Sequence, residues 1–360
     1  MRLDELQKIA KRRKLDVVLV RNEANIRALT GIVCDNAVLA VKRFSGCAVK
    51  KFRVALYTDF RYASMVHRVA PKLICRDLKR FGSGMSRPRR IGYESSISHA
   101  QFLEWEKKFP KATFVDVSKD IAAIRAVKTS EEIVGLRAAE KLNCEIWMAA
   151  QAKFRAGMTE RQMARIIRKL MIEKGEGEAF DTIVCVGKNA AECHHEPDDT
   201  VWNGREPVLV DMGVKLNGFC SDLTRNIRPG GFSNTETQSR RGVRKSGLYW
   251  KVYDLVLQAN RTAIAAAKPG MTGRQLDKVA RDVIRKGGFG KCFGHSLGHG
   301  VGYEIHEPPY ASKKGDMVLK PGMLVTIEPG IYLEDNLGVR IEDLVLITET
   351  GCEVLSNCEK

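Results

Sequence analysis

The chain has 360 residues, of which 44% are hydrophobic and 29% are charged. This length and balance predict a soluble protein of two domains and exclude a disordered or fibrous chain. Because there is no run of about 18 apolar residues, a membrane-spanning helix is excluded, and because the first residues lack the apolar segment of a signal peptide, we expect a cytoplasmic protein. The formal net charge of +17 favours anionic partners, yet no nucleic-acid-binding motif accompanies it, so nucleic acid is not the expected partner.

The ten cysteines are spread along the chain without a C-x-x-C pair. This spacing argues against a zinc ribbon or a redox motif, and we expect reduced thiols that act mostly as small hydrophobic residues. No direct repeat is evident.

Short apolar runs alternate with helical patterns in the first third of the chain. Strands are expected at residues 16–20, 36–40, 53–58 and 112–117, and a helix is expected at residues 98–109. Such an alternation predicts an α/β domain with a mixed sheet. We place this domain at residues 1–126.

The second domain is expected at residues 127–360. Its first helix is expected to begin at Thr129, because a hydroxyl side chain followed by carboxylates is typical of a capped helix start. Apolar residues at helical spacing extend this helix to about Arg155. Its other expected elements are helices at residues 159–174, 247–267 and 272–287, strands at 181–186, 207–213 and 219–227, a polar segment at 231–246, and several strands within 303–349.

Two aspartates, Asp211 and Asp222, lie on two expected strands that the dipeptide Asn217-Gly218 joins. Asn-Gly between two strands is a strong hairpin signal, and antiparallel pairing would bring the two carboxylates close together. Asp211 ends an apolar run, where an unpaired carboxylate is costly to bury. The pattern therefore predicts either a metal site or an ion pair, with Arg225 as the alternative partner.

Three of the seven histidines, His295, His299 and His306, fall within the sequence GHSLGHGVGYEIHE. The glycines between them allow the backbone to approach a ligand closely. We interpret the run VGYEI after His299 as a strand that directs His299 and His306 into one pocket. The clustering favours a functional site over three unrelated core or surface histidines.

Two glutamates complete the candidate ligands. Glu328 follows the apolar run MLVTI and precedes Pro-Gly. Glu342 lies in an expected apolar strand beside Arg340, so the cation that it requires is either that arginine or a metal. Four carboxylates in one pocket repel one another unless divalent cations neutralise them. Oxygen-rich ligation with one imidazole suits Mn²⁺, Co²⁺, Fe²⁺ or Zn²⁺, and two such ions predict hydrolytic chemistry.

The set Asp211, Asp222, His299, Glu328 and Glu342, in this order, resembles the ligand set of the pita-bread metallopeptidases, which include methionine aminopeptidase, aminopeptidase P and prolidase. The strings VLVDMG, SDLTR, GHGVG, IHE, TIEPG and GVRIED match as well, and NIRALTG, LYTDFRY and IGYESS resemble the creatinase-type N-terminal domain of the proline-directed branch. The resemblance covers nearly the whole chain. It implies an α+β protein in which a creatinase-like mixed α/β domain precedes a pita-bread catalytic domain.

The resemblance also implies roles for individual residues. Two divalent ions, with manganese expected first, would be bound by Asp211, Asp222, His299, Glu328 and Glu342. Glu328 would also shuttle a proton to the leaving proline nitrogen, and His194 and His306 would stabilise the tetrahedral intermediate. His295 would line the pocket for the proline ring, and Arg340 would orient the surroundings of Glu342. A homodimer is implied as well.

The expected activity is that of an Xaa-Pro aminopeptidase, which cleaves the bond between an N-terminal residue and a proline at position 2 of a peptide. Prolidase, which cleaves only dipeptides, is the nearest alternative. Some prolidases carry an arginine four residues after the histidine of IHE, where this chain has Tyr310, and this difference favours the aminopeptidase. An alternative of another class is an inactive pita-bread binding module that uses its basic surface, and the complete ligand set argues against it.

Overall fold

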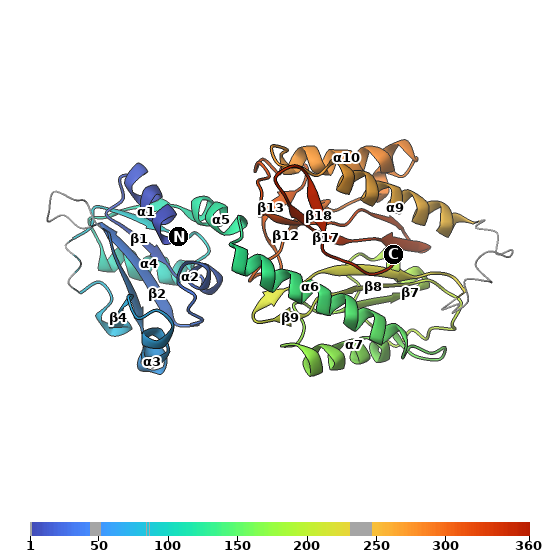
Figure 1. Ribbon diagram of the computed structural model, residues 1–360, viewed down its shortest axis with the longest axis horizontal. Coiled ribbons are helices and arrows are strands. Elements are labelled where there is room, and N and C mark those ends of the chain that lie inside the picture. The colour runs from blue at the N-terminus through green and yellow to red at the C-terminus, as the bar shows by residue number, and fades with distance from the viewer. Residues whose placement is uncertain (1, 44–51, 84, 86, 231–246) are drawn as a thin grey trace. The chain divides into compact units, whose positions relative to one another are not determined.

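The computed structural model describes residues 2–43, 52–83, 85, 87–230 and 247–360. The expected polar segment 231–246 therefore lies outside the described residues. The chain forms two compact units, Met1–Arg125 and Ala126–Lys360, each with its own hydrophobic cores (Figure 1). Among the described residues, no helix combines the length and the apolar character that crossing a bilayer requires.

A six-stranded mixed sheet organises the first unit. Its strands lie in the order β4 (Ile74–Asp77), β3 (Phe52–Thr58), β2 (Ala37–Arg43), β1 (Val17–Val20), β5 (Arg90–Tyr93) and β6 (Thr113–Asp116). Strands β1, β2 and β3 pair antiparallel, whereas β4, β5 and β6 join the sheet in parallel. The four expected strands are confirmed with small shifts at their ends. The strands expected from the sequence include neither β4, a largely exposed edge strand, nor β5, whose sequence RIGY has a charged residue and a glycine among its four residues.

Strand β1 is buried on both faces, which explains its uninterrupted apolar sequence. Val17 and Leu19 face a core that contains Trp105 of α4, and Val18 and Val20 face a second core on the other side. A strand that is covered on both faces has a continuous apolar run instead of an alternation. The helices of this unit are α1 (Arg2–Arg12), α2 (Glu23–Thr30), α3 (Phe60–Val69), α4 (His99–Lys108) and α5 (Ser118–Ala126), with a short 3₁₀ helix η1 (Leu78–Arg80).

The positive charge of the chain is concentrated in this first unit. Residues 1–125 contain 27 Lys and Arg against 12 Asp and Glu, a net charge of +15, whereas residues 126–360 contain 33 against 31, a net charge of +2. The excess charge is therefore carried by the unit that lacks the candidate metal ligands.

The described part of the second unit contains the long helices α6 (Ser130–Gln151), α7 (Glu160–Lys174), α9 (Leu248–Ala266) and α10 (Gly273–Lys286). They match the helices expected from the sequence. Helix α6 begins as predicted, because the Thr129 hydroxyl accepts from the Glu132 amide and the Glu132 carboxylate accepts from the Thr129 amide. Figure 1 shows α6 and α7 on one side of the strands and α9 and α10 on the other.

Helices α7 and α10 start with nearly the same sequence, GMTERQ and GMTGRQ. Both starts form capping boxes, from Thr159 and Thr272. In the sequence alone, a match over six residues is too short to indicate a repeat. The two copies differ at the first helical residue, which is Glu160 in α7 and Gly273 in α10. A Cβ atom on Gly273 would lie 2.0 Å from a backbone oxygen, so that position admits no side chain.

The strands of the second unit form several small sheets. One three-stranded sheet has the order β11 (Leu223–Ile227), β8 (Val208–Met212) and β7 (Ile183–Val186), and another has the order β14 (Leu324–Ile327), β17 (Asp343–Ile347) and β18 (Cys352–Val354). The pairs are β9 (Lys215–Leu216) with β10 (Phe219–Cys220), β12 (Gly298–Gly300) with β13 (Glu307–Ala311), and β15 (Gly330–Leu333) with β16 (Leu337–Arg340). Two 3₁₀ helices, η2 (Gly187–Ala191) and η3 (Gly290–Cys292), connect them.

Two expected strands differ from the structure. The strand expected at residues 219–227 is interrupted between β10 and β11, where the Ser221 hydroxyl accepts a hydrogen bond from the Val214 amide. The run VGYEI is not a strand, so that prediction is wrong. Within the run the Gly302 amide donates to the Glu304 carbonyl at 3.0 Å, a local bond that an extended strand does not make, and the Gly302 carbonyl accepts from the Cys220 amide at 2.8 Å.

Candidate metal centre

The hairpin between β9 and β10 determines where the two aspartates lie. Asn217 and Gly218 have φ values of 52° and 71°, as the favoured two-residue hairpin turn requires, and the expected hairpin is confirmed. Asp211 lies on β8 opposite Thr224 of β11. Asp222 immediately precedes β11, and both aspartates line one pocket of about 460 Å³.

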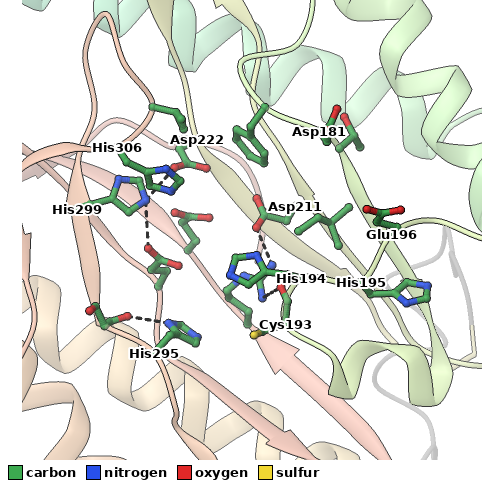
Figure 2. A pocket seen from close by; sticks show the side chains of 18 of the residues that line it. Asp181, Cys193, His194, His195, Glu196, Asp211, Asp222, His295, His299 and His306 are labelled. Atoms are coloured by element: carbon green, nitrogen blue, oxygen red, sulfur yellow. Dashed lines mark hydrogen bonds and ion pairs between the residues drawn. The ribbon is translucent and has the colours of Figure 1, made fainter. Parts of the chain in front are cut away.

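The other three candidate ligands come from later strands and line the same pocket (Figure 2). His299 lies on β12, Glu328 follows β14, and Glu342 lies between β16 and β17. The Nε2 atom of His299 is 3.5 Å from Oδ2 of Asp222 and 3.4 Å from Oε1 of Glu328. Ligand atoms of Asp222, His299 and Glu342 all lie within 4.8 Å of one another. The structure thus brings the five predicted ligands together.

Burial makes free anions costly in this pocket. It raises the pKa of Asp222 and of Glu342 well above their usual range, and the neighbouring carboxylates add to the shift. Burial likewise raises the pKa of Glu328 to about 8. Burial lowers the pKa of His299 to about 4, so its imidazole is neutral near pH 7 and can offer a lone pair to a metal.

Two carboxylate oxygens in the pocket are buried without a hydrogen-bond partner among the described residues, Oδ1 of Asp211 and Oε1 of Glu342. Buried polar atoms in native proteins are nearly always paired. Unfilled carboxylate oxygens beside a neutral imidazole are the donors that a divalent cation accepts. The residues present therefore fit the metal ions that the sequence predicts.

Arg340 connects the two sides of this group. Its Nη2 donates to Oδ2 of Asp211 at 2.6 Å, and its Nε donates to Oγ1 of Thr224 at 3.1 Å. The Thr224 hydroxyl in turn donates to Oε2 of Glu342 at 2.7 Å. Arg340 therefore binds Asp211 directly and reaches Glu342 through Thr224.

Arg225, the alternative partner suggested for Asp211, is occupied elsewhere. Its Nη2 lies 3.0 Å from Oδ1 of Asp343 in a fully buried ion pair, and it also donates to the Cys358 carbonyl. The alternative prediction of an ion pair between Asp211 and Arg225 is therefore wrong.

His295 is held in one orientation by a chain of hydrogen bonds. Its Nδ1 donates to the Ser296 carbonyl at 2.7 Å, and its Nε2 accepts from the Tyr332 hydroxyl at 2.8 Å. The Tyr332 oxygen accepts from Nη1 of Arg340 at 2.8 Å. Burial lowers the pKa of His295 to about 4, so this ring presents a neutral face to the pocket.

The two remaining candidate histidines also line the pocket. The His306 ring lies 4.3 Å from the His299 ring, centre to centre, and burial lowers the pKa of His306. His194 is near enough for its charge to lower the pKa of both His295 and His306 as a lesser cause. The neighbouring His195 ring points away from Asp211 (Figure 2) and binds Oε2 of Glu160 at 2.7 Å.

Two family models match the chain. That of metallopeptidase family M24 matches residues 134–349, and that of the creatinase/prolidase N-terminal domain matches residues 2–127. The chain belongs to metallopeptidase family M24. The matched region contains all five residues of the candidate metal centre.

This M24 chain aligns with curated proteins named Xaa-Pro dipeptidase. It is 44% identical to the one from Pyrococcus furiosus and 40% identical to the one from Pyrococcus horikoshii, each over 214 residues. These alignments cover 59% of this chain and span 58% and 57% of the two relatives.

Solved structures resemble the M24 chain over its whole length. The prolidase from Pyrococcus furiosus is 33% identical with a TM-score of 0.85, covering 98% of this chain and 99% of that one. The X-Pro aminopeptidase from Thermotoga maritima MSB8 is 29% identical with a TM-score of 0.81, covering 98% of each. The expected fold, a creatinase-like domain followed by a pita-bread domain, is confirmed.

Sequence reasoning missed Thr224 and Tyr332 in this M24 chain. Thr224 lies in the string SDLTR and Tyr332 lies two residues after the string TIEPG, but their hydroxyls contact residues 118 and 37 positions away. The burial of all five residues of β11, LTRNI, appears only in the folded structure, so no pattern in the sequence marks the Thr224 hydroxyl as one that needs a polar partner.

Proposed function

We propose that this M24 protein is a metal-dependent exopeptidase that cleaves the bond between an N-terminal residue and the proline that follows it. The observation that carries the proposal is the pocket in which five candidate ligands meet, with two buried oxygens that lack a partner among the described residues. Similarity to proteins named Xaa-Pro dipeptidase and prolidase supports the choice of substrate.

Two divalent ions would be held by Asp211, Asp222, His299, Glu328 and Glu342, and manganese suits this oxygen-rich set with a single imidazole. When bound, the ions would polarise the scissile carbonyl and acidify the attacking water. The ions would also neutralise carboxylates whose burial is otherwise costly.

The residues around the ligands would carry the rest of the chemistry. Glu328 would accept the proton of the attacking water and deliver it to the leaving proline nitrogen. His194 and His306 would donate hydrogen bonds to the oxyanion that forms at the carbonyl. The neutral His295 ring, fixed by Tyr332, would border the apolar proline ring.

The relatives favour dipeptides as substrates, since those curated and solved proteins are named Xaa-Pro dipeptidase or prolidase. One observation favours longer peptides as the second candidate. Among the described residues that line the pocket, Arg340 is the single Arg or Lys, and it is already paired with Asp211. A dipeptide carboxylate would need such a cation, and Tyr310, at the position of the arginine of some prolidases, does not line the pocket.

The ion-free binding module receives no support from this pocket, because a module without metals gains nothing from buried, unpaired carboxylate oxygens. The division into domains after residue 126, the homodimer and the cytoplasmic location stay predictions.

The proposal is tested by hydrolysis of Ala-Pro and Ala-Pro-Ala. The protein is stripped with a chelator, dialysed and reloaded with Mn²⁺, Co²⁺ or Zn²⁺, and a Glu328→Gln variant serves as the inactive control. Cleavage that depends on metal and is absent in the control supports the exopeptidase. The absence of cleavage of both peptides with every metal would contradict it.

The same experiment separates the two candidates. Cleavage of Ala-Pro alone identifies a dipeptidase, and release of alanine from Ala-Pro-Ala identifies an aminopeptidase. Amidation of the Ala-Pro carboxyl group provides a matched control, because a dipeptidase that requires the carboxylate loses this substrate whereas an aminopeptidase keeps it.

A further inference from the structure

A second group of potential metal ligands, Glu160, His195 and Asp198, lies in the same unit, and the mechanism above does not use it. Each Glu160 oxygen accepts two hydrogen bonds. Oε1 accepts from the Val186 amide at 2.6 Å and from Nδ2 of Asn189 at 2.9 Å. Oε2 accepts from Nε2 of His195 at 2.7 Å and from the Asp198 amide at 3.1 Å. The carboxylate is filled by protein donors, so this group is not a metal site.

The place of Glu160 on its helix stabilises the negative charge. It is the first residue of α7, directly after the Thr159 cap, and the amino-terminal end of a helix favours an anion. Its side chain is completely buried. The matching helix start of α10 has Gly273 at this position, so the carboxylate is not a requirement of the capping box.

The four donors bracket one segment, residues 186–198. Val186 and Asn189 lie near its beginning, and His195 and Asp198 lie near its end. His194 lies between these two points of attachment and lines the pocket. One buried side chain therefore holds both ends of the segment that carries this histidine.

The opposite side of the segment is also fixed. Nη1 of Arg340 donates to the Cys193 carbonyl at 3.4 Å. A Cβ atom on Gly338 of β16 would lie 1.7 Å from the Ala190 carbonyl oxygen, so the segment lies directly against that strand. The segment is therefore held by Glu160 near its two ends and lies against β16 at Ala190 and Cys193.

We propose that Glu160 is a positioning residue of the peptidase site. It fixes segment 186–198 so that the His194 side chain faces the pocket. It also accepts a hydrogen bond from the His195 ring, so that His195 has a structural role and His194 remains available to the substrate. This inference rests on the proposed role of His194 in the reaction.

The first test is a double-mutant cycle on kcat/KM of the metal-loaded enzyme. In Glu160→Gln the amide group would face two donors, so the segment loses part of its attachment. We expect kcat/KM to fall about 10–100-fold with unchanged metal content, as for other residues that orient a catalytic group. In a His194→Ala background the same substitution should change kcat/KM by less than about threefold. Glu173→Gln, at an exposed position of α7, is the matched control.

A second variant disturbs the same segment from the other side. Gly338→Ala forces the Ala190 backbone to move. Like Glu160→Gln, it should lower kcat/KM in the wild-type background and should leave kcat/KM nearly unchanged in the His194→Ala background. Gly351→Ala is the control, because its nearest neighbour would be 3.9 Å away. The proposal would be overturned if the reductions in kcat/KM were multiplicative in the double variants, or if Glu160→Gln had the kcat/KM of the wild-type enzyme.

A third measurement does not depend on activity. The chain has seven histidines, so the imidazole signals of histidine-labelled protein can be assigned by NMR with single substitutions. Glu160→Gln should shift the His194 and His195 signals and leave those of His67 and His99 unchanged. If the wild-type protein cleaves no Xaa-Pro peptide, the proposed function fails. An unchanged His194 signal in Glu160→Gln would separately contradict the positioning role, whether or not the protein is active.

Discussion

Glu160 and Glu342 are both buried glutamates of the second unit, yet the protein uses their oxygens differently. Both Glu160 oxygens accept two hydrogen bonds each. Glu342 accepts one hydrogen bond, from Thr224, and its Oε1 has no partner among the described residues. Burial by itself therefore does not mark a metal ligand. The number of acceptor positions that the protein leaves unfilled separates a ligand from a structural carboxylate.

The largest expected effect follows from removing a ligand. Glu342→Gln should lower kcat/KM by more than about 100-fold, the upper range for losing a residue that only orients a ligand. Metal content, measured by plasma mass spectrometry after dialysis, should fall with it. Glu349→Gln, an exposed position in the same region, should retain both, and an active Glu342→Gln enzyme with a full metal complement would remove Glu342 from the proposed ligands.

Stability of the metal-free protein should respond in opposite directions at the two sites. Glu160→Gln leaves buried donors without an acceptor and should lower the free energy of unfolding by about 3 kcal/mol. Glu342→Gln removes a carboxyl group whose ionised form is disfavoured by burial and by the neighbouring carboxylates, and it should raise the free energy of unfolding at pH 8. Urea unfolding of the two chelated variants measures both values, and shifts of the same sign would break the comparison.

The pH dependence of stability should also distinguish metal-free from metal-loaded protein. Burial raises the pKa of Glu328 to about 8, so from about pH 5 to 8 the folded state retains a proton that the unfolded state has released. The metal-free protein should therefore lose stability as pH rises through this range. Thermal unfolding at pH 6.5, 7.2 and 8 should show this decline, and it should shrink in Glu328→Gln and after loading with Mn²⁺. A flat profile for the metal-free protein would be inconsistent with the raised pKa.

The smallest expected effect concerns the orientation of His295. Tyr332→Phe removes one hydroxyl between Arg340 and His295, and the loss of about one hydrogen bond should raise KM for Ala-Pro about fivefold. Metal content should be unchanged, because Tyr332 contacts none of the five ligands by hydrogen bond in the described structure. A loss of metal in this variant would show that Tyr332 supports the ligands instead.

Short-range patterns predicted much of this molecule. The cap at Thr129 and the Asn217-Gly218 hairpin act over a few residues, so their physics is visible in the sequence. The run VGYEI was predicted wrongly because its apolar residues resemble a strand, whereas its Gly302 amide bonds locally to the Glu304 carbonyl and its Gly302 carbonyl accepts from Cys220, more than 80 positions earlier. Strand β4 was missed because it is a four-residue edge strand whose sequence, ICRD, is too short to show a clear strand pattern.

The sequence alone decides which chemical groups are available and in what order, including the five candidate ligands and the charge that places +15 of the net +17 on residues 1–125. Only the tertiary structure decided how each carboxylate is used. Glu160 and Glu342 are the same residue type with similar burial, and they differ because four donors converge on one and a single hydroxyl reaches the other. Hydrogen bonds act over about 3 Å, and the residues that come so close here are separated by tens to more than a hundred positions in the chain.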